Sequence, residues 1–138
     1  MREILFRGKS ENGKWIEGCL IHAEKYTCIL QNESKVHPMD YPYLDGELGT
    51  IDGKADPVVP ETVGQYTGLT DKNGKKIFEG DIVKWNINFA IVWQDCKFVI
   101  KKDINAKPYD YVLSCFDGTE FEVIGNIHDN PELLGGDN

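Results

Sequence analysis

Short apolar segments alternate with turn-forming residues along most of this chain, and this pattern predicts a mainly β fold with little helix. Asn-Gly or Asp-Gly pairs at 12–13, 73–74 and 117–118 supply the positive φ that tight hairpins need. A single helical turn is expected within 127–134, with Asn130 as N-cap and Pro131 at the first helical position. The expected strands are 3–7, 14–21, 26–30, 65–69, 76–78, 82–85, 89–93, 98–101, 109–115 and 121–127.

Two lobes are expected because the pattern changes along the 138 residues. In residues 1–62, the strand at 14–21 is apolar on both faces, which is typical of a covered β meander. Residues 63–138 contain closely spaced strands with glycine turns, which favours a small closed barrel or sandwich. We expect the two lobes to form one compact unit.

Residues 32–62 interrupt the strand pattern with prolines and scattered acids, so an irregular connection with at most one short strand is expected. Connections of this length are uncommon in compact domains, which favours either a loop or a surface on which another subunit packs. We therefore predict a homo-oligomer held partly by residues 38–60. The candidate binding residues are Pro38, Tyr41, Tyr43, Leu44, Gln65 and Tyr66.

The formal net charge of −8 is spread evenly along the chain and limits the choice of partners. An acidic surface repels phosphate backbones, so nucleic acid is an unfavourable partner. The aromatic side chains of Trp85, Phe89 and Trp93 could stack on bases, but core packing is the expected role. No apolar run approaches the roughly 18 residues that span a bilayer, and Glu3 lies where a signal peptide would be apolar. A cytoplasmic location is expected.

Neither metal nor cofactor chemistry is indicated. The four cysteines and three histidines show no Cys-x-x-Cys or His-x-x-x-His spacing, so no metal site and no cofactor are expected. Asp71, Glu79 and Asp81 cluster as a hydrolase would require, but the two aspartates stand at turn positions, where carboxylates accept backbone hydrogen bonds. No catalytic residue is therefore assigned.

The segment Val63–Val83 is the most distinctive part of the sequence, because it encloses short apolar segments between two turns. Its structural turn residues are Asp71, Gly74, Gly80 and Asp81. This segment resembles the YopX family of small bacteriophage and prophage proteins of Gram-positive bacteria, and the resemblance extends to the blocks 2–9, 13–18, 123–127 and 130–134. The resemblance implies a carboxy-terminal part similar to the Src-homology-3 type of small barrel, and it implies no catalytic residue.

These observations favour a non-enzymatic accessory or interaction protein of a phage, with an unidentified host or phage protein as a further partner. Two alternatives remain. One is an acidic inhibitor of a host nucleic-acid-binding protein, and the other is a hydrolase with an unrecognised acid–base site.

Overall fold

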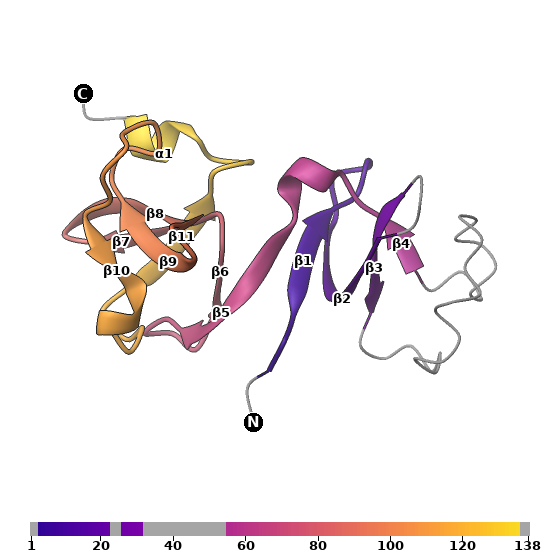
Figure 1. The fold of residues 1–138 in the computed structure, drawn as a ribbon, viewed down its shortest axis with the longest axis horizontal. Helices are drawn as coiled ribbons and strands as arrows, with labels where there is room; N and C mark the ends of the chain where they lie inside the picture. Colours follow the sequence, from indigo (N-terminus) through magenta and orange to yellow (C-terminus); the bar gives the residue numbers. More distant parts are fainter. Residues whose placement is uncertain (1–2, 23–25, 32–54, 136–138) are drawn as a thin grey trace. The chain divides into compact units, whose positions relative to one another are not determined.

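The computed structural model describes residues 3–22, 26–31 and 55–135 and divides the chain into two compact units, Glu3–Gln65 and Tyr66–Asn138. Both units are built from antiparallel strands, which confirms the prediction of a mainly β protein (Figure 1). The boundary at residues 65/66 lies close to the one expected at 62/63. That the two units pack into one compact body stays a prediction.

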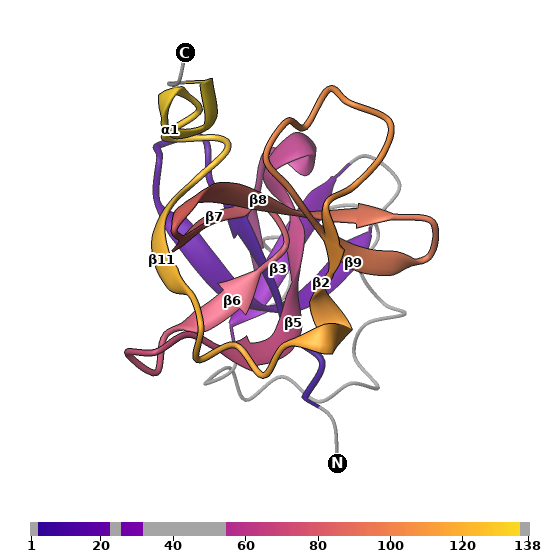
Figure 2. The same ribbon diagram turned by 90° about the vertical axis from the view of Figure 1, so that its left-hand side faces the viewer.

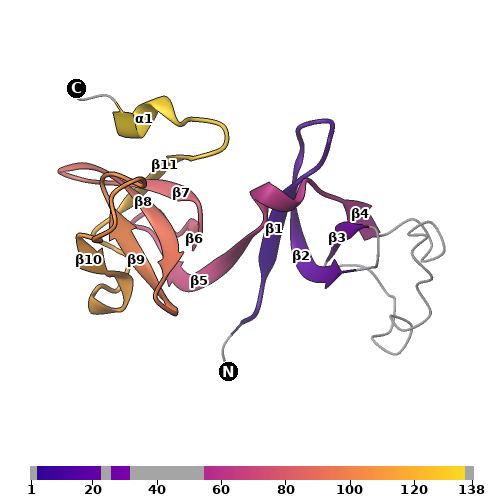
Figure 3. The same cartoon turned by 45° about the horizontal axis from the view of Figure 1, so that its top comes forward.

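The first unit is an antiparallel meander whose strands lie side by side in the order β4-β3-β2-β1-β5 (Figure 3). Its strands are β1 (Phe6–Lys9), β2 (Trp15–His22), β3 (Thr27–Gln31) and β4 (Ala55–Pro57), followed by the 3-10 turn η3 (Pro60–Thr62). The short strand β4 extends the meander within the region expected to be irregular. Strand β5 (Gly64–Thr70) begins here, where Gly64 and Gln65 pair with β1, and continues into the second unit.

Close backbone approach and a small apolar cluster hold the meander together. Ile16, Ile29 and Val58 form a buried cluster, each with less than a tenth of its surface exposed. Gly18 pairs with Gln31, and a Cβ at Gly18 would lie 2.0 Å from the carbonyl oxygen of Leu30. Glycine is therefore required at this position by packing rather than by its φ.

The second unit is a five-stranded antiparallel sheet, in the order β10-β9-β8-β7-β11. The hairpin of β5 and β6 precedes it in the chain, and Figure 2 labels this hairpin and four strands of the sheet, β7, β8, β9 and β11. Two-residue turns organise it. Asp95 and Cys96 both have positive φ (55° and 63°), as the tight turn between β8 and β9 requires. The elements are β6 (Lys76–Phe78), β7 (Asp81–Trp85), β8 (Ile87–Gln94), β9 (Lys97–Lys101), β10 (Tyr111–Val112), η4 (Leu113–Cys115), β11 (Glu122–Asn126) and α1 (Glu132–Gly135).

A cluster of aliphatic and aromatic side chains fills the second unit. Phe121 is fully buried, and its ring centroid lies 5.9 Å from that of Trp85 in an edge-on arrangement. Trp85 and Phe89 thus have the predicted core role. The buried members are Ile77, Val83, Phe89, Ile91, Ile100, Leu113 and Phe121.

Two sequence predictions differ from the structure near the carboxyl end. Of the strand expected at 109–115, only Tyr111–Val112 is extended, because the chain turns at Leu113 and the N–H of Phe116 donates to the Leu113 carbonyl oxygen. The α-helix begins at Glu132. Asn130 therefore lies two residues before it, and its Oδ1 accepts a hydrogen bond from the N–H of Asn126 at 3.2 Å.

The predicted barrel is not confirmed. Strand pairing runs from β10 to β11 and, within the described ranges, does not return from β11 to β10, so the sheet is not closed. Among residues 3–22, 26–31 and 55–135, no helix has the length and apolar character that a bilayer crossing demands.

Candidate functional site

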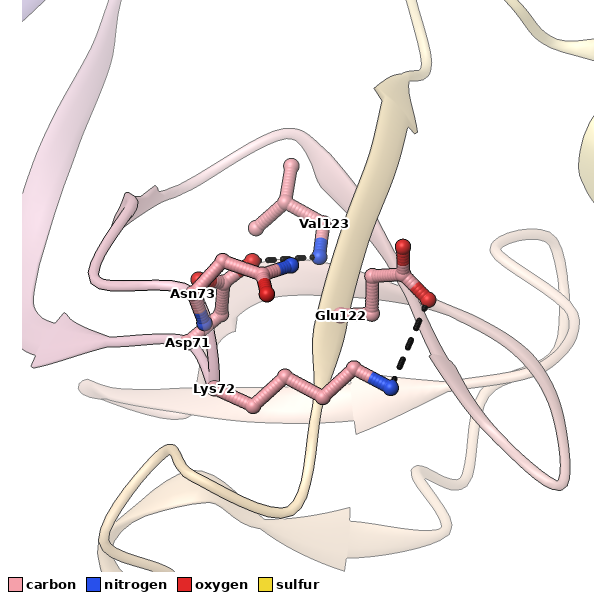
Figure 4. A network of polar contacts seen from close by, with 5 residues as sticks. All are labelled: Asp71, Lys72, Asn73, Glu122 and Val123. Atoms are coloured by element: carbon pink, nitrogen blue, oxygen red, sulfur yellow. Dashed lines mark hydrogen bonds and ion pairs between the residues drawn. The ribbon is translucent and has the colours of Figure 1, made fainter.

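Asp71 occupies the turn between β5 and β6 and ties that turn to a distant strand. Its Oδ1 accepts hydrogen bonds from the N–H groups of Asn73 and Lys75, at 2.8 and 2.9 Å. Its Oδ2 accepts from the N–H of Val123 in β11 at 2.9 Å (Figure 4). Asp71 is only 3% exposed, and Gly74, with φ of +82°, completes the turn. Both oxygens are therefore used to join two parts of the fold.

Backbone donors also control the ionisation of Asp71. Burial alone would raise the pKa of its carboxyl, but hydrogen bonds from Val123, Lys75 and Asn73, together with the Lys75 charge, lower the pKa below 3.8. A group whose folded-state pKa is lowered stabilises the fold above its unfolded pKa and loses that contribution as the pH falls through the folded value.

We expect the stability contribution of Asp71 to disappear in acid. The unfolding free energies of the parent and of Asp71→Asn should differ most at neutral pH, and the difference should shrink below about pH 4. Urea denaturation of both proteins between neutral and strongly acidic pH measures this difference. A gap that stays constant down to the acid limit of folding would refute the assignment.

The second turn of the Val63–Val83 segment is likewise structural. Asp81 is 1% exposed, and its Oδ2 accepts a hydrogen bond from the N–H of Phe78 at 2.7 Å. Gly80, with φ of +94°, donates its N–H to the carbonyl oxygen of Ile91, and its own carbonyl accepts from the N–H of Ile127, both at 2.8 Å. This turn therefore joins β6 and β7 to β8 and to the residue that follows β11.

A groove of about 480 Å³ on the second unit has an apolar, aromatic wall. Trp93 at the end of β8 is 50% exposed, and it packs edge-on against Phe98 of β9, with ring centroids 4.8 Å apart. Buried Leu113 contributes apolar surface. The groove is lined by Thr67, Leu69, Trp93, Cys96, Lys97, Phe98, Val112, Leu113, Ser114 and Phe116.

Local structure explains why Trp93 faces this groove. The Asp95-Cys96 turn places Trp93 directly opposite Phe98 in the register of β8 and β9. Aromatic side chains that lie directly opposite each other on antiparallel strands pack together and stabilise the sheet. Trp93 is nevertheless half exposed, so the prediction that it packs in the core is wrong.

Lys97 gives the groove its charge, because it is the one charged side chain among the lining residues. Its Nζ lies 4.9 Å from the centroid of the Tyr109 ring. A hydrogen bond with Tyr109 raises the pKa of Lys97, so the amine is cationic at neutral pH. In a protein of net charge −8, this groove presents a positive group beside aromatic surface.

Lys101 supports the loop that follows β9, a role that the sequence did not indicate. The side chain is 4% exposed, and its Nζ donates to Oε1 of Gln94 at 2.9 Å and to the carbonyl oxygens of Ala106 and Ile104. A buried amine with three oxygen acceptors fixes the backbone around it. Lys101 is therefore used structurally.

The residues predicted to bind partners fall in different places. Pro38, Tyr41, Tyr43 and Leu44 lie outside the described residues. Gln65 pairs with Phe6 in the first unit, whereas Tyr66 pairs with Phe78 in the second, with ring centroids 5.6 Å apart. Neither side chain lines the aromatic groove.

Two further grooves are more polar. One, of about 600 Å³, is lined by Asn86, Ile87, Asn88, Lys102, Glu132, Leu133 and Leu134. The other, of about 460 Å³, lies on the first unit and is lined by Ser10, Glu11, Asn12, Lys14, Ile16, Gln31, Asp56 and Pro57. Neither contains an aromatic side chain, so the Trp93 groove is the stronger candidate for recognition. In the part of the chain that the structure describes, no group of three or more His, Cys, Asp or Glu is arranged to hold a metal ion.

The four thiols differ in exposure. Burial in β3, reinforced by the nearby charge of Asp56, raises the pKa of Cys28 to about 11. Cys19, Cys96 and Cys115 are exposed. The thiolate is the reactive form, so burial and a raised pKa both protect Cys28.

We expect three of the four thiols to react quickly with Ellman's reagent in the native protein at a concentration of ~1 μM. Cys28 should react at least about tenfold more slowly at mildly alkaline pH, because only a small fraction of Cys28 side chains is in the thiolate form at that pH. Unfolding in denaturant should release the fourth thiol, and Cys28→Ser should abolish the slow phase. Four equally fast thiols in the native protein would show that this assignment is wrong.

The comparisons with known proteins agree with this architecture. The family model described as "YopX protein" matches residues 5–135. Among curated proteins, none matches the chain. The crystal structure of protein EF1440 from Enterococcus faecalis is similar in fold, with a TM-score of 0.57 and 22% sequence identity over 97% of this chain and 99% of that one. Because the family model covers nearly the whole chain, this protein belongs to the YopX family.

Proposed function

We propose that this protein is a non-catalytic interaction protein that binds its partners through the aromatic groove around Trp93. The half-exposed Trp93 beside Phe98 is the observation that carries the proposal. Large aromatic side chains are enriched at the centres of protein interfaces, where they bury apolar surface at low entropic cost. The groove also offers a cation in Lys97, which adds orientation to the apolar contact.

The use of the turn carboxylates supports a non-catalytic role. Asp71 accepts three backbone hydrogen bonds, and Asp81 is buried with a backbone donor on Oδ2. A carboxylate occupied in this way is poorly placed to exchange a proton with substrate or to attack it. A structural role accounts for both residues without an acid–base site.

Three finer expectations belong to the same proposal. The protein acts as an accessory of a phage or prophage in the cytoplasm of the bacterial host. Its second unit serves as a small barrel of the Src-homology-3 type, although strand pairing in the described residues is open. It forms a homo-oligomer held partly by residues 38–60. The acidic inhibitor and the hydrolase are the alternatives that the following test separates.

Selection from a library of random linear peptides tests the proposed function. We expect ligands of micromolar affinity that bind at least about tenfold more weakly to Trp93→Ala. Ile87→Ala is the matched control, because it removes a side chain of equal exposure (51%) from the same strand, β8, outside this groove. Melting curves establish that both variants are folded.

Other results would contradict the proposal in recognisable ways. Ligands that bind Trp93→Ala as well as the parent would place recognition elsewhere. Binding of a basic nucleic-acid-binding protein that weakens steeply with salt and ignores Trp93 would favour the acidic inhibitor. Hydrolysis lost on replacing Glu79 or Asp81, with folding retained, would favour the enzyme.

A further inference from the structure

We infer that the occupant of the aromatic groove is the segment Pro38–Leu44 of a second copy of this chain. This inference rests on the proposed function and names its ligand. The segment reads Pro-Met-Asp-Tyr-Pro-Tyr-Leu and combines two prolines, two tyrosines and an aspartate within seven residues. Three properties of the groove and of the connection that carries the segment support this inference.

The first property is the apolar, aromatic lining. Proline and tyrosine rings pack well against indole and phenyl faces, and an extended proline-containing peptide enters an aromatic groove at low entropic cost. Trp93, Phe98 and Phe116 supply such faces, and Leu113 adds aliphatic surface to the lining. The segment offers Pro38, Tyr41, Pro42, Tyr43 and Leu44 to them.

The second property is charge. Lys97 is the single charged lining residue, whereas the segment and its neighbours carry Asp40, Asp45 and Glu47. Complementary charge at the rim of an interface speeds association and sets the direction of the bound peptide. An acidic peptide is thus favoured here even though the protein as a whole is acidic.

The third property is reach. Leu30 and Ala55 are paired across β3 and β4, so the connection between these strands begins and ends at neighbouring points of the first unit. A connection formed by residues 32–54 can extend outward by at most about 35 Å before it must return. That length is sufficient to carry the segment Pro38–Leu44 beyond the surface of its own unit and onto another molecule.

A second copy is the occupant that we infer, and reciprocal exchange between two identical chains fills both grooves. Each copy supplies one segment and receives one, which produces a closed, twofold-symmetric dimer. Docking of the segment on its own chain would leave a monomer, so the two arrangements differ in mass.

A synthetic peptide of residues 36–47 tests the recognition step. Labelled with fluorescein, it should bind the full-length variant Tyr41→Ala/Tyr43→Ala, whose own segment is disabled, with a dissociation constant of about 10–100 μM. Lys97→Glu or Trp93→Ala in that background should weaken binding at least about fivefold, and Ile87→Ala should not. A peptide with lysine in place of Asp40 and Asp45 should prefer the Lys97→Glu protein, a reversal that loss of folding cannot produce.

Light scattering of the full chain tests the second copy. The parent should have the mass of a dimer at concentrations above the dissociation constant, and Tyr41→Ala/Tyr43→Ala and Trp93→Ala should be monomers that still melt cooperatively. A peptide that fails to bind, or binds regardless of Trp93 and Lys97, overturns the inference. A monomeric parent whose groove is closed to the peptide overturns it too, because the segment then docks on its own chain. If the random library yields Trp93-dependent ligands while this peptide does not bind, the inference fails and the proposed function stands.

Discussion

Replacing Asp71 with alanine is expected to lower the free energy of unfolding by about 3 kcal/mol, a large effect for a side chain in a turn. The substitution removes the acceptor of three backbone N–H groups, two within the turn and one on Val123 in β11. Hydrogen bonds to a charged acceptor are stronger than neutral ones, and donors left without partners in a buried place add a desolvation cost. Chemical denaturation of parent and variant measures the difference.

Lys72→Ala is the matched control for this prediction. Lys72 is the next residue, and its Nζ lies 3.6 Å from Oε1 of Glu122 across the same two segments (Figure 4). Both side chains of that ion pair are well exposed, so its loss should cost less than about 0.5 kcal/mol. Equal losses at Asp71 and Lys72 would mean that the turn is not held by the buried carboxylate.

Gly118→Ala is expected to destabilise the protein by about 3 kcal/mol or more, because two penalties combine there. Its φ of +98° is strained for any residue with a Cβ, and a Cβ would lie 2.3 Å from the carbonyl oxygen of Thr70. That oxygen belongs to the backbone of β5, so it cannot move aside without disturbing the strand. The same denaturation experiment measures the loss.

Gly68→Ala separates the two penalties. Gly68 has a similar φ of +93°, but nothing lies within 4 Å of a Cβ placed on it. We expect a loss of only about 1 kcal/mol, the cost of the backbone conformation alone. If the two alanine variants unfold alike, the close approach of Gly118 to Thr70 does not exist in solution.

The strands and turns could be predicted where local signals are strong. The Asn73-Gly74 pair marks the β5–β6 turn, and the return strand 76–78 has the predicted bounds because its apolar residues Ile77 and Phe78 lie between this turn and the next one. At 109–115 a similar apolar pattern predicted a strand that the structure has only at Tyr111–Val112. Leu113 is buried by the 3-10 turn η4 rather than by a strand, and periodicity does not distinguish these two ways of burying one side chain.

The candidate site was much harder to predict than the fold. The turn role of Asp71 follows from its position before Asn-Gly, but its bond to Val123 depends on how β11 passes the turn. Trp93 looks like a core residue because it continues an apolar strand. Its exposure depends on neighbours from β9 and η4, which only the folded chain brings together. Groove residues from separate segments leave no common motif in the sequence.

The central claim is that the aromatic groove is the surface through which this protein binds a partner, a second copy of itself. The most direct test is the rate at which iodoacetamide alkylates Cys96, which lines the groove, relative to exposed Cys19 in the first unit. As the protein concentration rises from ~1 to ~300 μM, the account predicts that the Cys96 rate falls about fivefold or more while the Cys19 rate stays within about twofold. Trp93→Ala should abolish this protection. A Cys96 rate that is independent of concentration, or that falls in parallel with Cys19, would contradict the account.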